Sequence, residues 1–154
     1  MNLKATLSPD DLARACADAM WEHDDASSGL GMKIIGVGPG RATLTMTVQP
    51  HMVNGQRIAH GGFIFTLADS AMAFACNSHN EKAVAARGDI TFIRPGKLGD
   101  TLVAVAREIS RSGRSGIYDV RVSVGDEVIA EFRGHSRTIG GTWLPVGESA
   151  TKKK

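Results

Sequence analysis

Hydrophobic residues concentrate in one continuous stretch in the middle of the chain. From Phe63 to Cys76, apolar and small residues occupy every face of a helical wheel, which is the pattern of a helix buried on all sides. The stretch therefore predicts a central helix that the rest of the chain encloses. One carboxylate, Asp69, falls inside it, and a buried charge costs free energy unless it is paired or used.

Alternating apolar and polar positions predict strands on both sides of this helix. Between Arg41 and Val48, for example, apolar residues alternate with threonines, as in a strand with one buried face. The predicted strands cover about residues 32–37, 41–48, 84–92, 101–109, 117–124 and 128–138. Short glycine-containing turns join most of them, so the sheet is expected to be mainly antiparallel. A sheet curled around the apolar helix buries that helix best, which predicts an α+β fold.

The remaining segments complete a single domain, for which 154 residues with 42% hydrophobic content suffice. We expect an N-terminal helix (about 9–22) and a loop (24–31) within residues 1–30, and the enclosed-helix domain over 31–141. Residues 142–154 contain proline, glycine and three terminal lysines. They are expected to form a flexible tail, with membrane or nucleic-acid contact as the alternative.

Charge and cysteine content bear on partners and compartment. A formal net charge of +2 is too small to imply a nucleic-acid partner by itself. Cys16 and Cys76 form neither a disulfide framework nor a metal-binding pair, and the first residues lack a signal-peptide core. No apolar run reaches the roughly 18–20 residues of a membrane span. We therefore expect a cytoplasmic protein with no nucleic-acid partner and no membrane partner.

Common catalytic and metal motifs are missing from the sequence. The five histidines show no metal-ligand spacing, so no metal site is expected. No serine lies in the GxSxG pattern of a hydrolase nucleophile. The glycines from Gly36 to Gly40 lack GxGxxG spacing and precede a strand, so no dinucleotide site is expected. Cys76 lies near Asp69 on the helix but is expected to pack in the core.

The candidate chemistry lies where the chain enters the central helix. His60, Gly61 and Gly62 precede the apolar residues, and at such a position backbone N–H groups and the helix dipole favour developing negative charge. Asp69 can supply a base or a nucleophile, or it can be a structural carboxylate capped by Asn54 or by strand amides. Both interpretations remain open on the residues alone.

The spacing of these groups predicts a dimer. Eight residues separate Gly61 from Asp69, which is a rise of about 12 Å on a helix. Reacting groups must approach to about 3–3.5 Å, so one chain can hardly complete the site. Two antiparallel helices across a two-fold axis would bring Gly61 of one chain toward Asp69 of the other.

Several short motifs resemble those of one enzyme family. They are Asn54-Gly55, His60-Gly61-Gly62, Leu67-Ala68-Asp69 and Asp89-Ile90-Thr91-Phe92-Ile93-Arg94-Pro95-Gly96. With these motifs the chain resembles the hotdog-fold acyl-CoA thioesterases. Residues 75–78 and 132–136 are similar to those of the phenylacetic-acid-degradation branch. The resemblance spans about residues 31–141.

The resemblance implies a hotdog fold, in which a curved antiparallel sheet wraps a long central helix. Two chains pair, and usually two such dimers form a tetramer. It also implies hydrolysis of acyl-CoA with aryl-acetyl or medium-chain acyl groups, with coenzyme A as part of the substrate and no separate cofactor. By similarity, the Gly61 amide polarises the thioester carbonyl, Asn54 and His60 orient substrate or water, and Asp69 of the partner chain acts as general base or nucleophile.

Basic residues near strand ends, and the two residues that follow Arg94, are the candidates for contact with the coenzyme A portion of the substrate. Guanidinium groups pair well with phosphates, although scattered basic residues are mostly solvated. The candidate contacts are Arg94, Pro95, Gly96, Arg111, Arg114 and Arg137.

Two alternatives stay open. A hotdog hydratase would need a histidine within the central helix, which carries Asp69 instead. A non-catalytic acyl-CoA sensor would bind without turnover, and tight binding without hydrolysis would favour it. Relatives often carry a serine or threonine before the stretch Asp89-Ile90-Thr91-Phe92, where this chain has Ala85-Ala86-Arg87-Gly88-Asp89. Arg87 or Asp89 could therefore reshape the pocket.

Overall fold

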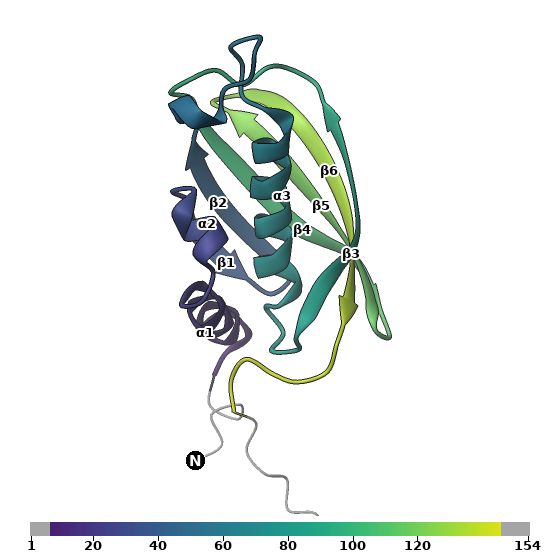
Figure 1. Cartoon of the computed structure of the whole chain (residues 1–154). Coiled ribbons are helices and arrows are strands. Elements are labelled where there is room, and N and C mark those ends of the chain that lie inside the picture. Colours follow the sequence, from purple (N-terminus) through teal and green to yellow (C-terminus); the bar gives the residue numbers. More distant parts are fainter. Residues whose placement is uncertain (1–6, 146–154) are drawn as a thin grey trace, which may run out of the picture.

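One curved antiparallel sheet wraps around helix α3 in the computed structural model, which describes residues 7–145 (Figure 1). The helices are α1 (Pro9–Trp21), α2 (Asp25–Gly29) and α3 (Gly61–Cys76), with a 3-10 turn at Pro50–Met52. The strands are β1 (Lys33–Gly38), β2 (Arg41–Thr47), β3 (Ala83–Phe92), β4 (Thr101–Ser112), β5 (Ser115–Val124) and β6 (Glu127–Thr138). This arrangement confirms the predicted α+β hotdog architecture and every predicted strand.

The strand order explains how α3 becomes enclosed. It runs β1-β2-β4-β5-β6-β3 across the sheet. The pairs β1–β2, β4–β5 and β5–β6 are antiparallel hairpins. After β2 the chain crosses the concave side of the sheet as α3, and β3 then pairs with β6 at the opposite edge (Figure 1). β3 is therefore an edge strand with one free side.

Helix α3 packs its apolar residues into the concave face of the sheet. Leu67, Ala71 and Phe74 of the helix are almost completely buried. Leu44 of β2 and Tyr118 of β5 belong to the same buried core and are also inaccessible to solvent. The long apolar run thus forms the centre of the molecule, as its pattern predicts.

The prediction that α3 is buried on every side is wrong for the single chain. Its less buried positions that no other helix covers form what we call the open face of α3: Gly62, Phe65, Thr66, Asp69 and Ala73. These positions are spaced three or four residues apart and so lie on one side of the helix. The sheet curves around the opposite side, and the open face is left without cover in one chain.

The N-terminal segment contains one more helix than predicted. Ser8 caps α1 by accepting a hydrogen bond from the Asp11 amide at 3.1 Å, as expected for an N-cap serine. The predicted loop from 24 to 31 instead contains α2. Asp24 caps that helix by accepting from the Ser27 amide at 2.9 Å, and the Ser27 hydroxyl lies 2.8 Å from that of Ser70 in α3. The short helix is therefore held by its cap and by α3.

Residues 142–145 do not follow the prediction of a flexible tail. The amide of Trp143 donates to Asn80 Oδ1 at 3.0 Å, and its indole Nε1 donates to Asn77 Oδ1 at 2.8 Å. Because Asn77 is the C-cap of α3, this segment is held against the C-terminal end of the helix. The rest of the predicted tail, 146–154, lies outside the described residues.

Among residues 7–145, none of the helices is long and apolar enough to cross a membrane.

Candidate active site

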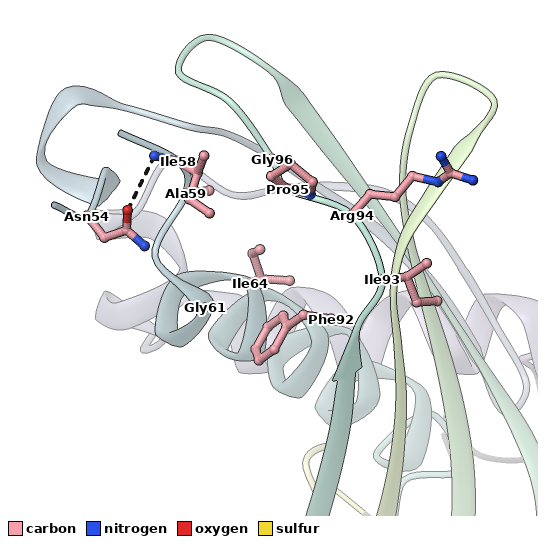
Figure 2. Close-up of a pocket in the computed structure, with 10 residues that line it drawn as sticks. All are labelled: Asn54, Ile58, Ala59, Gly61, Ile64, Phe92, Ile93, Arg94, Pro95 and Gly96. Atoms are coloured by element: carbon pink, nitrogen blue, oxygen red, sulfur yellow. Dashed lines mark hydrogen bonds between the residues drawn. The ribbon is translucent and has the colours of Figure 1, made fainter. Parts of the chain in front are cut away.

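A cavity of about 490 Å³ opens at the N-terminal end of α3 (Figure 2). Its walls come from the loop before α3, from the first turn of the helix and from the segment that follows β3. The lining residues are Asn54, Ile58, Ala59, Gly61, Ile64, Phe92, Ile93, Arg94, Pro95 and Gly96. The structure thus brings together five of the site residues predicted from the sequence, namely Asn54, Gly61, Arg94, Pro95 and Gly96.

The first turn of α3 presents a backbone amide to this cavity. His60 is the N-cap, and its Nδ1 accepts a hydrogen bond from the Gly62 amide at 2.9 Å. The Gly61 amide donates no hydrogen bond to any other described residue. A Cβ atom on Gly61 would lie 2.8 Å from Cζ of Phe92, so a larger residue at this position would have to displace that ring. One N–H at the positive end of the helix dipole is therefore available to an electronegative atom.

Asn54 is fixed by the loop that precedes the helix. Its Oδ1 accepts from the amides of Gln56 at 3.0 Å and Ile58 at 3.3 Å, and its own amide donates to the Ile58 carbonyl at 2.9 Å. Arg57 completes this tight loop with a positive φ of 61°. Because the amide oxygen is occupied, Nδ2 is the group that Asn54 can offer as a donor at the cavity wall (Figure 2).

Asp69 lies outside this cavity, two turns further along α3. It is half-buried on the open face of the helix, and burial raises the pKa of its carboxyl above the ordinary value. Within one chain, Asp69 is therefore not among the residues that line the cavity with Gly61.

The basic residues divide between the two ends of the molecule. Arg94 lies at the cavity rim, but its side chain extends away from the cavity (Figure 2) and approaches Glu127 at 3.7 Å. Arg111 and Arg114 lie at the hairpin between β4 and β5, and Arg137 lies near the end of β6. The structure does not bring these last three to the cavity of the same chain.

The apolar walls of the cavity are what sequence reasoning missed. Ile58, Ile64, Phe92 and Ile93 line it, although they read as ordinary core or strand residues in the sequence. Phe92 and Ile93 remain 50% and 48% exposed. A signal was available, because two consecutive large apolar residues, Phe92 at the last position of β3 and Ile93 just after it, stand directly before Arg94.

Other candidate groups contribute less. Cys76 is buried in the core, as predicted, and burial raises the pKa of its thiol to about 12. Within residues 7–145, no cluster of three or more histidine, cysteine, aspartate or glutamate side chains could hold a metal ion.

Known proteins are similar to this chain in sequence and in fold. The thioesterase superfamily model matches residues 56–131. The acyl-coenzyme A thioesterase PaaI of Escherichia coli (strain K12) is 46% identical over 127 residues, which cover 82% of this chain and 91% of the relative. The solved structure of the E. coli PaaI protein from the phenylacetic acid degradation operon superposes with a TM-score of 0.86 at 43% identity, covering 88% of this chain and 99% of that one.

A third similar protein was solved with a ligand. The structure of smu.793 from Streptococcus mutans bound to acetyl CoA is 27% identical, with a TM-score of 0.70, and the match covers 72% of this chain and 90% of that one.

Proposed function

Because the chain belongs to the thioesterase superfamily, we propose that it hydrolyses acyl-CoA thioesters to a free acid and coenzyme A in the cavity at the start of α3. The observation that carries this proposal is the meeting of the Gly61 amide with an apolar cavity of about 490 Å³. A thioester carbonyl placed there receives a hydrogen bond from a helix N-terminus, which stabilises the negative charge that develops on its oxygen.

The cavity walls suit an apolar acyl group. Ile58, Ile64, Phe92 and Ile93 surround its interior, and such surfaces bind apolar groups by removing them from water. Aryl-acetyl and medium-chain acyl groups are therefore the proposed substrates. Asn54 Nδ2 supplies a donor at the wall, while His60 maintains the helix start that aims the Gly61 amide.

A second copy of the chain supplies the carboxylate. If two α3 helices pack antiparallel through their open faces, Gly61 of one chain lies opposite Asp69 of the other when the two-fold axis passes at the level of Phe65. The Phe65 ring packs against Gly88, because a Cβ atom on Gly88 would lie 3.0 Å from Phe65 Cζ. The same axis thus passes near the middle of β3, so the two free edges can pair while the helices meet.

This arrangement also affects the distant arginines. A two-fold axis near the middle of β3 reverses the second sheet, so the β4–β5 hairpin of one chain lies toward the cavity end of the other. We therefore propose that Arg114 and Arg137 reach the coenzyme A phosphates of substrate bound in the neighbouring chain. Arg111 is a weaker candidate because its Nε lies 3.8 Å from Glu108 Oε1. Arg94, Pro95 and Gly96 would contact the coenzyme A arm at the cavity mouth.

Asp69 can then act in two ways. As a general base it takes a proton from water, which attacks the thioester carbonyl and releases the coenzyme A thiolate. As a nucleophile it attacks the carbonyl itself, expels the thiolate and forms a mixed anhydride that water opens. A covalent acyl adduct on Asp69, sought by rapid quenching and mass spectrometry, distinguishes the two.

The test is thiol release from a panel of acyl-CoA substrates. The wild type is expected to hydrolyse aryl-acetyl-CoA or medium-chain acyl-CoA. Asp69→Asn should lower kcat/KM by about 10²–10⁴-fold, whereas Asp25→Asn on the surface of α2 should leave it unchanged. No thiol release by the wild type, or full activity of Asp69→Asn, would contradict the proposal. Tight acyl-CoA binding without release would instead support the sensor alternative.

The assembly and compartment are further parts of the proposal. We propose a dimer, with two dimers forming a tetramer, in the cytoplasm. The open face of α3 and the free edge of β3 support self-association. Cys16 and Cys76 are buried free thiols, which suits a reducing compartment.

A further inference from the structure

The convex side of the sheet carries a row of charges that alternate in sign from strand to strand. Arg107 of β4 lies opposite Asp119 of β5, which lies opposite Arg133 of β6, which lies opposite Asp89 of β3. Arg133 donates two hydrogen bonds to Asp119, Nε to Oδ1 at 2.6 Å and Nη2 to Oδ2 at 2.8 Å. The row ends with the negative charge of Asp89 at the free edge of the sheet.

Two opposite charges flank the middle of that edge. Gly88 faces Phe65 and Phe132 on the concave side, and because side chains alternate along a strand, Arg87 and Asp89 point to the convex side. Both are exposed. Within residues 7–145, neither takes part in an ion pair.

Two β3 edges related by a two-fold axis can pair antiparallel in only a few registers. Directly opposite residues must point to the same face of the joined sheet, so the axis near the middle of β3 can pass at Arg87, Gly88 or Asp89. An axis at Arg87 puts two arginines opposite each other, and an axis at Asp89 puts two aspartates opposite each other. Like charges directly opposite are destabilising. An axis at Gly88 instead places Arg87 of each chain opposite Asp89 of the other.

We propose that Arg87 and Asp89 set the register in which two copies of this chain pair through β3, by forming two symmetric ion pairs about an axis at Gly88. This inference rests on the proposed function, because it concerns the second copy that supplies Asp69. Arg87 of the second chain extends the alternating row beyond Asp89. The axis at Gly88 also agrees with the helix spacing, since Gly88 packs against Phe65, midway between Gly61 and Asp69.

The register matters because it sets the distance between the two halves of the site. A strand rises about 3.4 Å per residue. Moving the axis by one residue displaces one chain along the other by about twice that distance, roughly 7 Å. Groups that must approach to about 3–3.5 Å would then no longer meet. Arg87 and Asp89 are therefore positioning residues, which act on catalysis through the placement of Asp69.

The experiment uses two single variants whose β3 edges carry opposite charge. Arg87→Asp makes both edge charges negative, and Asp89→Arg makes both positive. Each variant alone would place like charges opposite each other, so its dimer dissociation constant should rise by about ten- to a hundredfold, and thiol release at a fixed low concentration should fall with it. An equal mixture restores opposite charges at both positions. It should recover dimerisation, measured by analytical ultracentrifugation, together with activity.

A role in folding alone would not be rescued by mixing two defective chains. Arg107→Asp, on the same convex face but away from the edge, is the matched control. Because it keeps Arg87 and Asp89, it should associate as tightly as the wild type on its own. Wild-type association of either single variant would overturn the inference, and so would a mixture no better than its components. A wild type that dimerises but releases no thiol would overturn the proposed function, while the association data would still judge the register.

Discussion

Asp69 has to lose its proton before it can act as a base or as a nucleophile. Burial raises the pKa of its carboxyl above the ordinary value of 3.8. The ionised, active fraction therefore increases as the pH rises through this raised pKa. We expect the acid limb of the profile of kcat/KM against pH to have its midpoint above 3.8.

This profile needs a control for unfolding in acid. Circular dichroism and sedimentation over the same pH range should show a folded, associated enzyme where activity is lost. An acid limb at or below the ordinary aspartate value would contradict the assignment of Asp69.

Tyr118 and Glu108 form a second polar site, remote from the cavity. The buried hydroxyl of Tyr118 donates to Glu108 Oε1 at 2.7 Å, and His79 Nε2 lies 3.0 Å from the same oxygen. Burial raises the pKa of Glu108, but the hydrogen bonds from Tyr118 and His79 and the charge of Arg111 outweigh it, so the pKa lies below 4.5. The network therefore stabilises the ionised carboxylate.

Removing the hydroxyl should destabilise the fold. Tyr118→Phe is expected to lower the free energy of unfolding by about 1–2 kcal/mol at neutral pH, measured by urea denaturation. Because the folded pKa of Glu108 is depressed, its contribution is complete above 4.5 and is lost as the pH falls through the lowered value. The difference between variant and wild type should thus shrink in acid. Thr101→Val, at an exposed strand end, should change stability by less than about 0.5 kcal/mol.

At the scale of elements, α3 approaches the sheet closely because β6 carries a glycine beneath it. A Cβ atom on Gly134 would overlap the sulfur of Met72 and lie 2.9 Å from Cε1 of Phe132. Gly134→Ala should therefore push the helix from the sheet and cost about 1–3 kcal/mol of unfolding free energy. Gly36→Ala in β1 is the control, because nothing lies within 4 Å of its added methyl group. Equal thermal stability of the two variants would contradict this account of the packing.

The elements that the sequence predicted well are those with a strong pattern. The alternation along β2 and the apolar run of α3 reflect burial, which decides both local structure and packing. The helix α2 was missed because its five residues carry no apolar face, and its cap at Asp24 becomes meaningful only beside Ser70 of α3. Trp143 was assigned to a tail because its partners, Asn77 and Asn80, are more than sixty residues away in the sequence.

At the scale of the whole molecule, the site is expected to need two chains. Asp69→Asn removes the carboxylate, and Gly61→Val should fill the cavity beside Phe92. Each variant alone should be inactive. In an equal mixture half of the dimers are mixed, and each of these has one intact site. Thiol release should therefore return to about a quarter of the wild-type specific activity. A mixture that stays inactive, although mass spectrometry shows mixed dimers, would contradict a shared site.

Only part of the candidate site could be predicted from the sequence. Asn54 and Gly61 could be placed together because they flank one short loop. The separation of Asp69 from Gly61 followed from helix geometry. The contribution of Phe92 depends on β3 crossing to the far edge of the sheet, and that arrangement follows from packing rather than from any local motif.

The free edge of β3 also affects the solubility of the chain before it assembles. A ten-residue strand with one unpaired edge, on which Val84 and Phe92 are each about half exposed, can act as a template on which unrelated strands aggregate. Charged residues on such an edge discourage promiscuous pairing. Arg87 and Asp89 would then reduce aggregation of newly made chains through the free edge of β3 until that edge pairs with a second copy. Expression of the uncharged Arg87→Ala/Asp89→Ala chain would accordingly carry a cost in solubility before any cost in catalysis.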